Sequence, residues 1–236
     1  MNSFEYQKVR RVAVTKPDPA AMIEDYDPNV GPPPGAEDLI AYCARVSNPG
    51  NQSNFETAGR LLKYCINNKH WSIFEMANVV LEIETTRDIG RQILRHRSFS
   101  FQEFSQRYAK VEEHSFVLRE ARLQDTKNRQ NSIDTVSEDT KAWWLDVQQR
   151  HRDTVIADYN AALKRGIAKE VARAILPEGL TMSKLYVQGS LRSWIHYCGV
   201  RNDPGVTQKE HVDIAAKAWA ILREDFSFLD SIEDDR

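Results

Sequence analysis

Residues 78–84 (NVVLEIE) alternate between two sets of side chains, and this alternation constrains the fold more than any other feature of the sequence. Val79, Leu81 and Ile83 fall on one side of an extended chain, as they do in a half-buried β-strand. The residues from Thr85 onward predict a helix directly after this strand. The chain must therefore fold with both strands and helices.

The same periodicities predict the remaining elements of a single domain that spans residues 1–236. Two further strands are expected over 9–15 and 184–188. Residues 16–36 are rich in Pro, Asp and Gly and predict a surface loop, and the polar, aperiodic residues 112–136 predict a second loop. Helices are expected over 37–46, 53–66, 137–164, 169–176, 190–201 and 207–222, with capping boxes in SNFE (53–56) and TQKE (207–210).

The composition of this domain is balanced in charge. Lys and Arg number 32 and Asp and Glu number 34, whereas proteins that bind nucleic acid usually carry a clear positive excess. Cys43, Cys65 and Cys198 are odd in number and widely spaced, so neither a disulfide framework nor a zinc site is expected, and a reducing compartment fits best. No stretch resembles a signal peptide or reaches the roughly 20 apolar residues that span a bilayer. We expect a cytoplasmic protein with no membrane or nucleic-acid partner.

Basic side chains are concentrated in residues 95–108 (RHRSFSFQEFSQRY), where three arginines and a histidine are interleaved with four aromatic rings. Arg87, Arg91 and Arg95 recur at every fourth position, so they share one face of the predicted helix. Taken alone, such a run is typical of a solvated charged surface. Arginine also binds phosphates and planar anions through its two-pronged guanidinium. No P-loop, GxGxxG, HExxH or GxSxG motif offers another chemistry.

The segment combines RHR at 95–97 with a serine, Ser105, after seven intervening residues. This pattern resembles the signature of the flavin-dependent thymidylate synthases. Four more segments resemble that family in the expected order, namely ARVS (44–47), HWSIFE (70–75), EVARAILP (170–177) and RSWIHYCGVRND (192–203). The resemblance extends over nearly the whole chain. Two positions depart from the family pattern: Met76 stands where His is frequent, and Gln102 stands where Asn is frequent.

The resemblance implies an α/β (α+β) fold with a mixed sheet flanked by helices, assembled as a homotetramer with flavin sites between subunits. It implies that a one-carbon unit passes from methylenetetrahydrofolate to C5 of dUMP. Reduced FAD then converts this unit to the methyl group of dTMP, and NADPH reduces the FAD again. No metal ion takes part in the implied reaction.

The resemblance also implies roles for individual residues. Arg201 would face the uracil ring and stabilise its N3-deprotonated form, so that C5 attacks without a covalent enzyme adduct. The FAD-binding residues would be Ser72, Arg95, His96, Arg97, Glu103, Ser190, Arg192 and His196. The dUMP-binding residues would be Gln92, Arg95, Glu103, Phe104, Ser105, Gln106, Arg107, Arg173 and Arg201. The cysteines would be buried small side chains and not nucleophiles.

Two other functions stay open at this point. An enzyme on the same scaffold could stop at a hydroxymethyl pyrimidine nucleotide or use another pyrimidine, and product analysis separates these cases. A nucleic-acid-binding module could use the arginines for phosphates and the aromatic rings for base stacking. Flavin absorption of the purified protein would exclude such a module.

Overall fold

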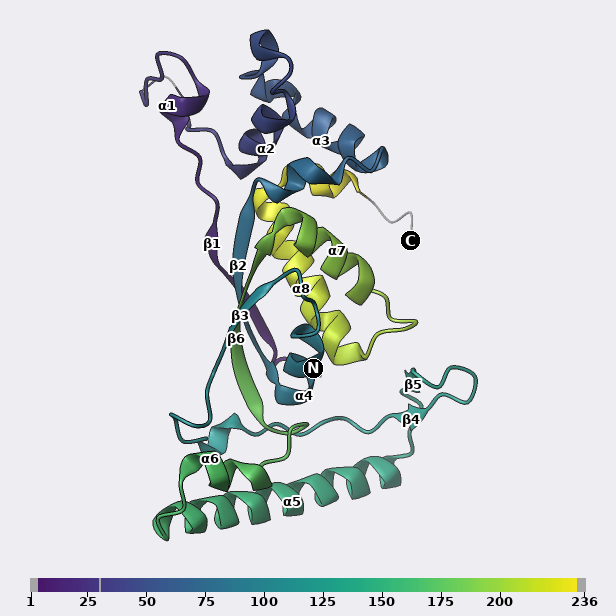
Figure 1. Ribbon diagram of the computed structural model, residues 1–236. Coiled ribbons are helices and arrows are strands. Elements are labelled where there is room, and N and C mark those ends of the chain that lie inside the picture. Colours follow the sequence, from purple (N-terminus) through teal and green to yellow (C-terminus); the bar gives the residue numbers. More distant parts are fainter. Residues whose placement is uncertain (1–3, 30, 233–236) are drawn as a thin grey trace.

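A four-stranded sheet forms the centre of the molecule, with the strand order β1-β2-β6-β3 (Figure 1). The computed structural model describes residues 4–29 and 31–232. The strands are β1 (Lys8–Val14), β2 (Asn78–Thr86), β3 (Ser100–Glu103) and β6 (Met182–Ser190). The three strands expected from the sequence are confirmed as β1, β2 and β6.

The sheet is antiparallel, and the expectation of a mixed sheet is wrong for the residues described. Thr86, where β2 ends, lies opposite Met182, where β6 begins, so the chain enters these two strands from opposite ends. In the same way, Ser100 at the start of β3 lies opposite Gln188 near the end of β6. β1 also runs antiparallel to β2.

Each helix expected from the sequence is present, with its ends shifted by a few residues. The described helices are α1 (Pro19–Met22), α2 (Ala36–Ala44), α3 (Ala58–Asn67), α4 (Arg87–Ile93), α5 (Glu138–Lys164), α6 (Lys169–Ala172), α7 (Leu191–Arg201) and α8 (Lys209–Asp225). A short hairpin, β4 (Leu123–Gln124) with β5 (Ser132–Ile133), lies within the expected loop 112–136. No helix in the described ranges is long and apolar enough to cross a membrane.

One face of the sheet carries the main hydrophobic core. Val79, Leu81 and Ile83 are fully buried, as their alternation predicts, and Leu185 and Val187 of β6 pair with the same strand. The helices α7 and α8 pack on this face (Figure 1). Full burial stabilises each aliphatic side chain by roughly 1.5–3 kcal/mol relative to exposure, so this face holds the sheet and both helices together.

The opposite face of the sheet carries charged side chains. Glu82 accepts two hydrogen bonds from Arg10, at 2.6 and 2.9 Å, and forms an ion pair with Lys184 at 3.4 Å. The Arg10 hydrogen bond is the main reason that the pKa of Glu82 is lowered to about 2.

Both predicted capping boxes are wrong. The Ser53 hydroxyl donates to the carbonyl of Met22 at 2.7 Å, and α3 begins five residues later, at Ala58, after a 3₁₀ turn. The Thr207 hydroxyl donates to the carbonyl of Val200 at 3.3 Å, so it does not cap α8. In each case a tertiary acceptor competes successfully for the hydroxyl that the local pattern assigns to a helix end.

The long helix α5 lies away from the sheet, along the far end of the molecule beside α6 (Figure 1). The helix begins where the sequence predicts, with Ser137 capping its first turn, and Gly166, with φ of 81°, follows its last turn. Val155 and Tyr159 belong to a second, smaller core. Leu145 lies outside that core and is 45% exposed, although its spacing predicts a place on the apolar stripe.

Candidate active site

Arg87 and Arg91, two of the three arginines expected to share a helix face, converge on the same carboxylates. They form ion pairs with Glu103, at 3.2 and 3.0 Å, and with Glu178, at 3.1 and 3.5 Å. Ser183 donates a further hydrogen bond to Glu103 at 3.0 Å. The carboxylate of Glu103, expected to contact both FAD and dUMP, is therefore already neutralised within the chain.

Arg201 reaches His96 from the C-terminal end of α7. The Nε–H of Arg201 donates to Nε2 of His96 at 2.9 Å. A nitrogen that accepts a hydrogen bond carries no proton, so His96 is neutral. Burial, and then the positive charge of Arg201, lower the pKa of His96 to about 4. The two Nη groups of Arg201 have no partner among residues 4–29 and 31–232, so the guanidinium is oriented but not neutralised.

Gln92 lies near this pair, in a chain of polar side chains. Its Oε1 lies 3.2 Å from Nδ1 of His211, and its Nε2 donates to Oε1 of Gln208 at 2.8 Å. Nε2 of His211 lies 3.1 Å from the hydroxyl of Tyr197. The ring centroids of His211 and His96 are 6.5 Å apart. Sequence reasoning missed this chain of contacts, because no local pattern connects α4 with α7 and α8.

A pocket of about 610 Å³ opens between the 3₁₀ helix Trp71–Glu75 and α7. Arg192 and His196, both expected to bind FAD, line this pocket together. Trp71 and Ile195 supply apolar surface to its walls. The pocket therefore combines a cationic group with apolar walls, which suits a ligand that is both aromatic and anionic.

The other residues expected at the flavin site surround this pocket or the His96 pair. Ser72 is exposed on the 3₁₀ helix that forms one wall. Ser190 is buried and accepts a hydrogen bond from the backbone N–H of Ser193 at 3.3 Å, so its hydroxyl caps α7 as predicted. Arg95 and Arg97 are exposed on either side of His96.

Several of the residues expected to bind dUMP form a separate group near α6. Arg107 pairs with Glu170 at 3.6 Å, and its backbone N–H donates to the Ser105 hydroxyl at 3.4 Å. Gln106 is buried, and its Nε2 has no hydrogen-bond partner. The neighbouring members are Phe104, which is 40% exposed, and Arg173, which begins a 3₁₀ turn after α6. Within the described part of the chain, no hydrogen bond or ion pair joins this group to Arg201 or His96.

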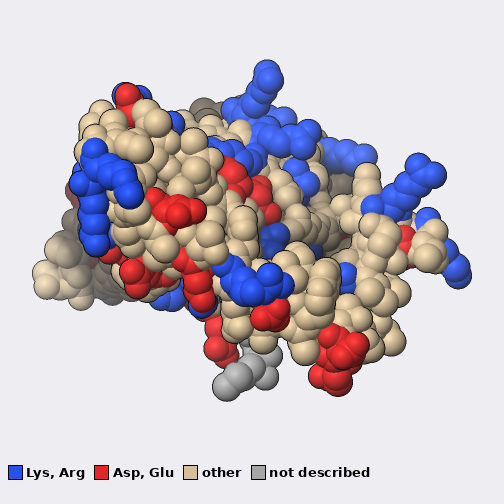
Figure 2. All heavy atoms as spheres, turned by 90° about the horizontal axis from the view of Figure 1, so that it is seen from below, with Lys and Arg blue, Asp and Glu red and all other residues tan. Residues whose placement is uncertain are grey.

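The electrostatic character of the surface agrees with the balanced composition. Figure 2 shows Lys and Arg side chains interspersed with Asp and Glu over the face seen from below. Long-range attraction to a polyanion needs a continuous basic patch, so the arginines of the candidate site act on ligands at short range.

The fold and the site define a class of protein: an α+β protein with an antiparallel sheet, in which α7 ends at an arginine held by a neutral histidine and also lines a pocket suited to an aromatic, anionic ligand. Comparisons with known proteins agree. A family model described as "Thymidylate synthase complementing protein" matches residues 30–226. The chain is 54% identical to a probable flavin-dependent thymidylate synthase of Paramecium bursaria Chlorella virus 1, over 81% of this chain and 87% of that protein.

A second relative, the flavin-dependent thymidylate synthase of Synechocystis sp., is 50% identical over 92% of this chain and 95% of its own length. The chain belongs to the family of flavin-dependent thymidylate synthases. The fold is also that of the UMP/dUMP methylase PolB from Streptomyces cacaoi, solved with 5-Br dUMP. That structure superposes with a TM-score of 0.76 at 22% identity and covers 94% of this chain and 92% of its own.

The two neutral histidines predict an acid-sensitive fold. The pKa of His96 is lowered to about 4 and that of the buried His211 to about 3, from an ordinary value of 6.5. The unfolded chain therefore binds more protons below pH 6.5, and stability falls as the pH falls from there. We expect His211 to remove about 2 kcal/mol from the free energy of unfolding between pH 7.5 and pH 5, and half-buried His96 to remove less.

Urea unfolding at pH 7.5 and pH 5 measures this difference. The matched control is His211→Asn, which should retain only the smaller loss due to His96. Glu82 does not interfere, because a carboxyl with a pKa lowered to about 2 changes its contribution only below about pH 4.5. Equal stability of the parent protein at both pH values would contradict the prediction.

Proposed function

We propose that Arg201 activates dUMP for reductive methylation, with His96 holding its guanidinium in place. The chain is a flavin-dependent thymidylate synthase, which converts dUMP to dTMP and depends on FAD. The observation that carries the proposal is the asymmetric bonding of Arg201. Its Nε–H is fixed by neutral His96, whereas neither Nη group has a carboxylate partner among the residues that the structure describes.

This bonding suits an arginine that stabilises a developing anion. When the uracil ring loses its N3 proton, negative charge spreads over the ring and makes C5 electron-rich. A guanidinium stays charged at any working pH and offers two N–H groups in one plane, so Arg201 can stabilise this form without a change of protonation. His96 serves as the acceptor that orients Arg201. Its Nε2 is occupied by this contact, so that nitrogen is not available as a general base.

The residues that line the pocket between the 3₁₀ helix Trp71–Glu75 and α7 are chemically suited to FAD. Arg192 is half exposed and pairs with Glu75 at 3.1 Å. An exposed pair of this kind contributes little, so a flavin pyrophosphate can replace the carboxylate. Trp71 and Ile195 offer apolar surface to a ring system, and His196 adds a polar contact. When bound, FAD supplies the reducing equivalents for the methyl group, and Ser72, Arg95, Arg97 and Ser190 would surround it.

The nucleotide phosphate would bind to Ser105, Arg107 and Arg173. The ion pair of Arg107 with Glu170 is long and exposed on both sides, so it offers little resistance to a phosphate.

A homotetramer would bring the separate parts of the site together. Among residues 4–29 and 31–232, no hydrogen bond or ion pair joins Arg107 or Arg173 to the Arg201 pair, yet one nucleotide must reach both its phosphate ligands and Arg201. We propose that the phosphate ligands of one subunit face the Arg201 pair of another, with FAD between subunits. A stable, active monomer in a size measurement would exclude this arrangement.

The remaining co-substrates are proposed to be methylenetetrahydrofolate as carbon donor and NADPH as reductant. The test supplies the purified protein with FAD, dUMP and both co-substrates and identifies the product by mass. Formation of dTMP supports the proposal, and NADPH oxidation should rise when dUMP is added. A hydroxymethyl deoxyuridine nucleotide as end product would support the alternative reaction, and absence of any nucleotide product would contradict both.

We expect Ser105→Ala to weaken dUMP binding and yet to retain methylation. The hydroxyl is a phosphate ligand in this proposal, and one hydrogen bond to a charged group is worth roughly 1.5–3 kcal/mol. A serine nucleophile needs an adjacent base, and Ser105 contacts the backbone N–H of Arg107 instead. Titration with dUMP and a methylation assay at saturating dUMP separate the two effects. A trapped Ser105 adduct, with no product from the variant, would establish covalent catalysis.

The cysteines supply the control for this prediction. Cys65 and Cys198 are buried, as predicted, whereas Cys43 is only partly buried. Burial raises the pKa of Cys43 and Cys65, which makes their thiolates less available. Single replacements of each cysteine by serine should therefore leave methylation detectable.

A further inference from the structure

The hydrogen bonds from Tyr197 through His211 to Gln92 all run in the same donor-to-acceptor direction. Oε1 of Gln92 can only accept, so Nδ1 of His211 carries the proton and donates to it. A neutral histidine with its proton on Nδ1 has an acceptor at Nε2, and the Tyr197 hydroxyl donates to that atom. Nε2 of Gln92 then donates one of its two N–H groups to Gln208. Each of these three contacts therefore pairs one donor with one acceptor.

The two residues that set this direction are rigidly held. Tyr197 and His211 are both fully buried. The ring of Tyr197 contacts Trp194 edge-on, with centroids 5.7 Å apart, and lies edge-on to His96 at 5.0 Å. Burial raises the pKa of Tyr197 well above its ordinary value, so the hydroxyl keeps the proton that it donates.

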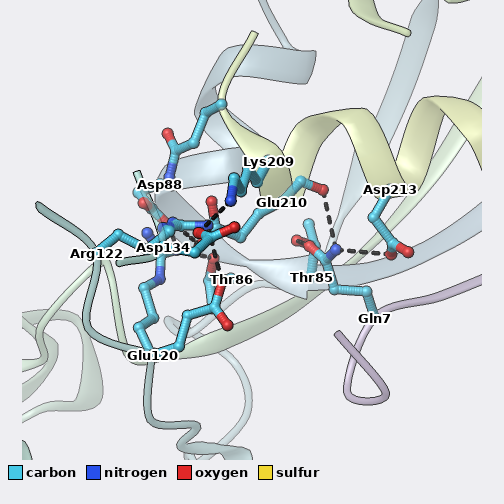
Figure 3. Close-up of polar contacts among 12 residues, drawn as sticks. Gln7, Thr85, Thr86, Asp88, Glu120, Arg122, Asp134, Lys209, Glu210 and Asp213 are labelled. Carbon is cyan, nitrogen blue, oxygen red and sulfur yellow. Dashed lines mark hydrogen bonds and ion pairs between the residues drawn. The ribbon is translucent and has the colours of Figure 1, made fainter. Parts of the chain in front are cut away.

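His211 and Gln208 lie at the start of α8, and residues from other parts of the chain hold this turn in place. The carboxylate of Glu210 forms an ion pair with Arg122, and its backbone carbonyl accepts from the side chain of Gln7 at 2.9 Å (Figure 3). Arg122 and Glu210 are both largely buried. The start of α8 is thus fixed before any ligand binds.

We propose that Tyr197 and His211 are positioning residues that hold the Gln92 amide so that it offers dUMP a hydrogen-bond donor and not an acceptor. The inference rests on the proposed function and on the place in the dUMP site that the family resemblance implies for Gln92. Oε1 of Gln92 accepts from His211 and one N–H donates to Gln208, and the second N–H has no partner among residues 4–29 and 31–232. The side chain is only partly buried, so this N–H can reach a ligand. The carbonyl, ribose and phosphate oxygens of dUMP all accept.

The test measures the Kd of dUMP and the methylation kinetics of the FAD-loaded enzyme for three variants. His211→Leu removes the donor to Gln92 and lets the amide turn, so we expect Kd and KM for dUMP to rise on the order of tenfold, the worth of one hydrogen bond. The kcat at saturating dUMP should change less than about threefold, because Arg201 is untouched. His211→Asn restores an N–H near Nδ1 and should return the Kd to within about threefold of the parent.

Tyr197→Phe keeps the packing but removes the hydroxyl that fixes the histidine proton, and should raise the Kd in the same direction. This variant still tests the inference if His211→Leu does not fold. Ile214→Val, a fully buried apolar change on α8, is the matched control and should leave the Kd unchanged. An unchanged Kd in Tyr197→Phe, or a failure of His211→Asn to restore binding that His211→Leu has lost, would overturn the inference.

Gln92→Ala tests the place of Gln92 in the dUMP site separately from the positioning role of Tyr197 and His211. It should raise the Kd of dUMP as much as His211→Leu does, and the double variant should be no worse than either, because both remove the same interaction. If Gln92→Ala binds dUMP normally, the assignment of Gln92 to the site fails. If Gln92→Ala is impaired and His211→Leu is not, the site stands and the positioning role is wrong.

Discussion

Arg201→Ala is expected to form dTMP about a hundredfold more slowly than the parent protein, or slower still, while it retains FAD. The guanidinium is the group proposed to stabilise the uracil anion, and loss of one such preorganised donor typically costs about 3 kcal/mol of transition-state stabilisation. The pocket proposed to bind FAD is lined by Arg192 and His196, and its lining does not include Arg201. Flavin absorbance and a single-turnover assay at saturating dUMP measure the two properties separately.

Arg150→Ala is the matched control for this experiment. It removes the same charge from α5, where Arg150 is exposed and paired with Asp146. Its loss should change the rate less than about threefold, because exposed ion pairs contribute little. The rate of dTMP formation by Arg201→Lys should lie between the rates of Arg201→Ala and of the control, since a lysine keeps the charge and loses the planar guanidinium. Normal turnover by Arg201→Ala would show that the activation role is wrong.

Gly189→Ala is expected to destabilise the fold by about 3 kcal/mol or more. A Cβ at position 189 would lie 2.2 Å from Cδ1 of Phe99 and 2.5 Å from its Cε1. The Phe99 ring cannot move away easily, because it packs against Trp194 with a centroid distance of 4.5 Å and against Tyr197 at 5.7 Å. For a chain of 236 residues, a loss of 3 kcal/mol lowers the Tm by roughly 6–12 °C.

The clash that Gly189→Ala causes should also disturb the candidate active site. The backbone N–H of Phe99 donates to the carbonyl of His96 at 3.2 Å, so a displaced Phe99 moves the residue that orients Arg201. Gly50→Ala is the control, since a Cβ there has no atom within 4 Å. Adding Phe99→Leu to Gly189→Ala should recover part of the Tm by making room. An unchanged Tm in Gly189→Ala would contradict the packing described here.

The features that sequence reasoning predicts correctly are those encoded by near neighbours along the chain. The alternation of Val79, Leu81 and Ile83 identifies β2 and its buried face, because residues two apart share a face in any strand. Ser137 identifies the start of α5 because its own helix supplies the partner of its hydroxyl. Ser53 and Thr207 fit the same local pattern and fail, since each finds an acceptor elsewhere.

The sequence by itself determined the family, the order of β1, β2, β6 and the longer helices along the chain, and the types of residue from which a site for dUMP and FAD can be built. Only the tertiary structure decided that the sheet is antiparallel, that Glu103 is neutralised by two arginines, and that His96 accepts from Arg201. His96 and Arg201 are 105 positions apart, and Gln92 and His211 are 119 apart. Such pairs form only when α4, α7 and α8 pack together, and no periodicity along the chain encodes how distant elements pack.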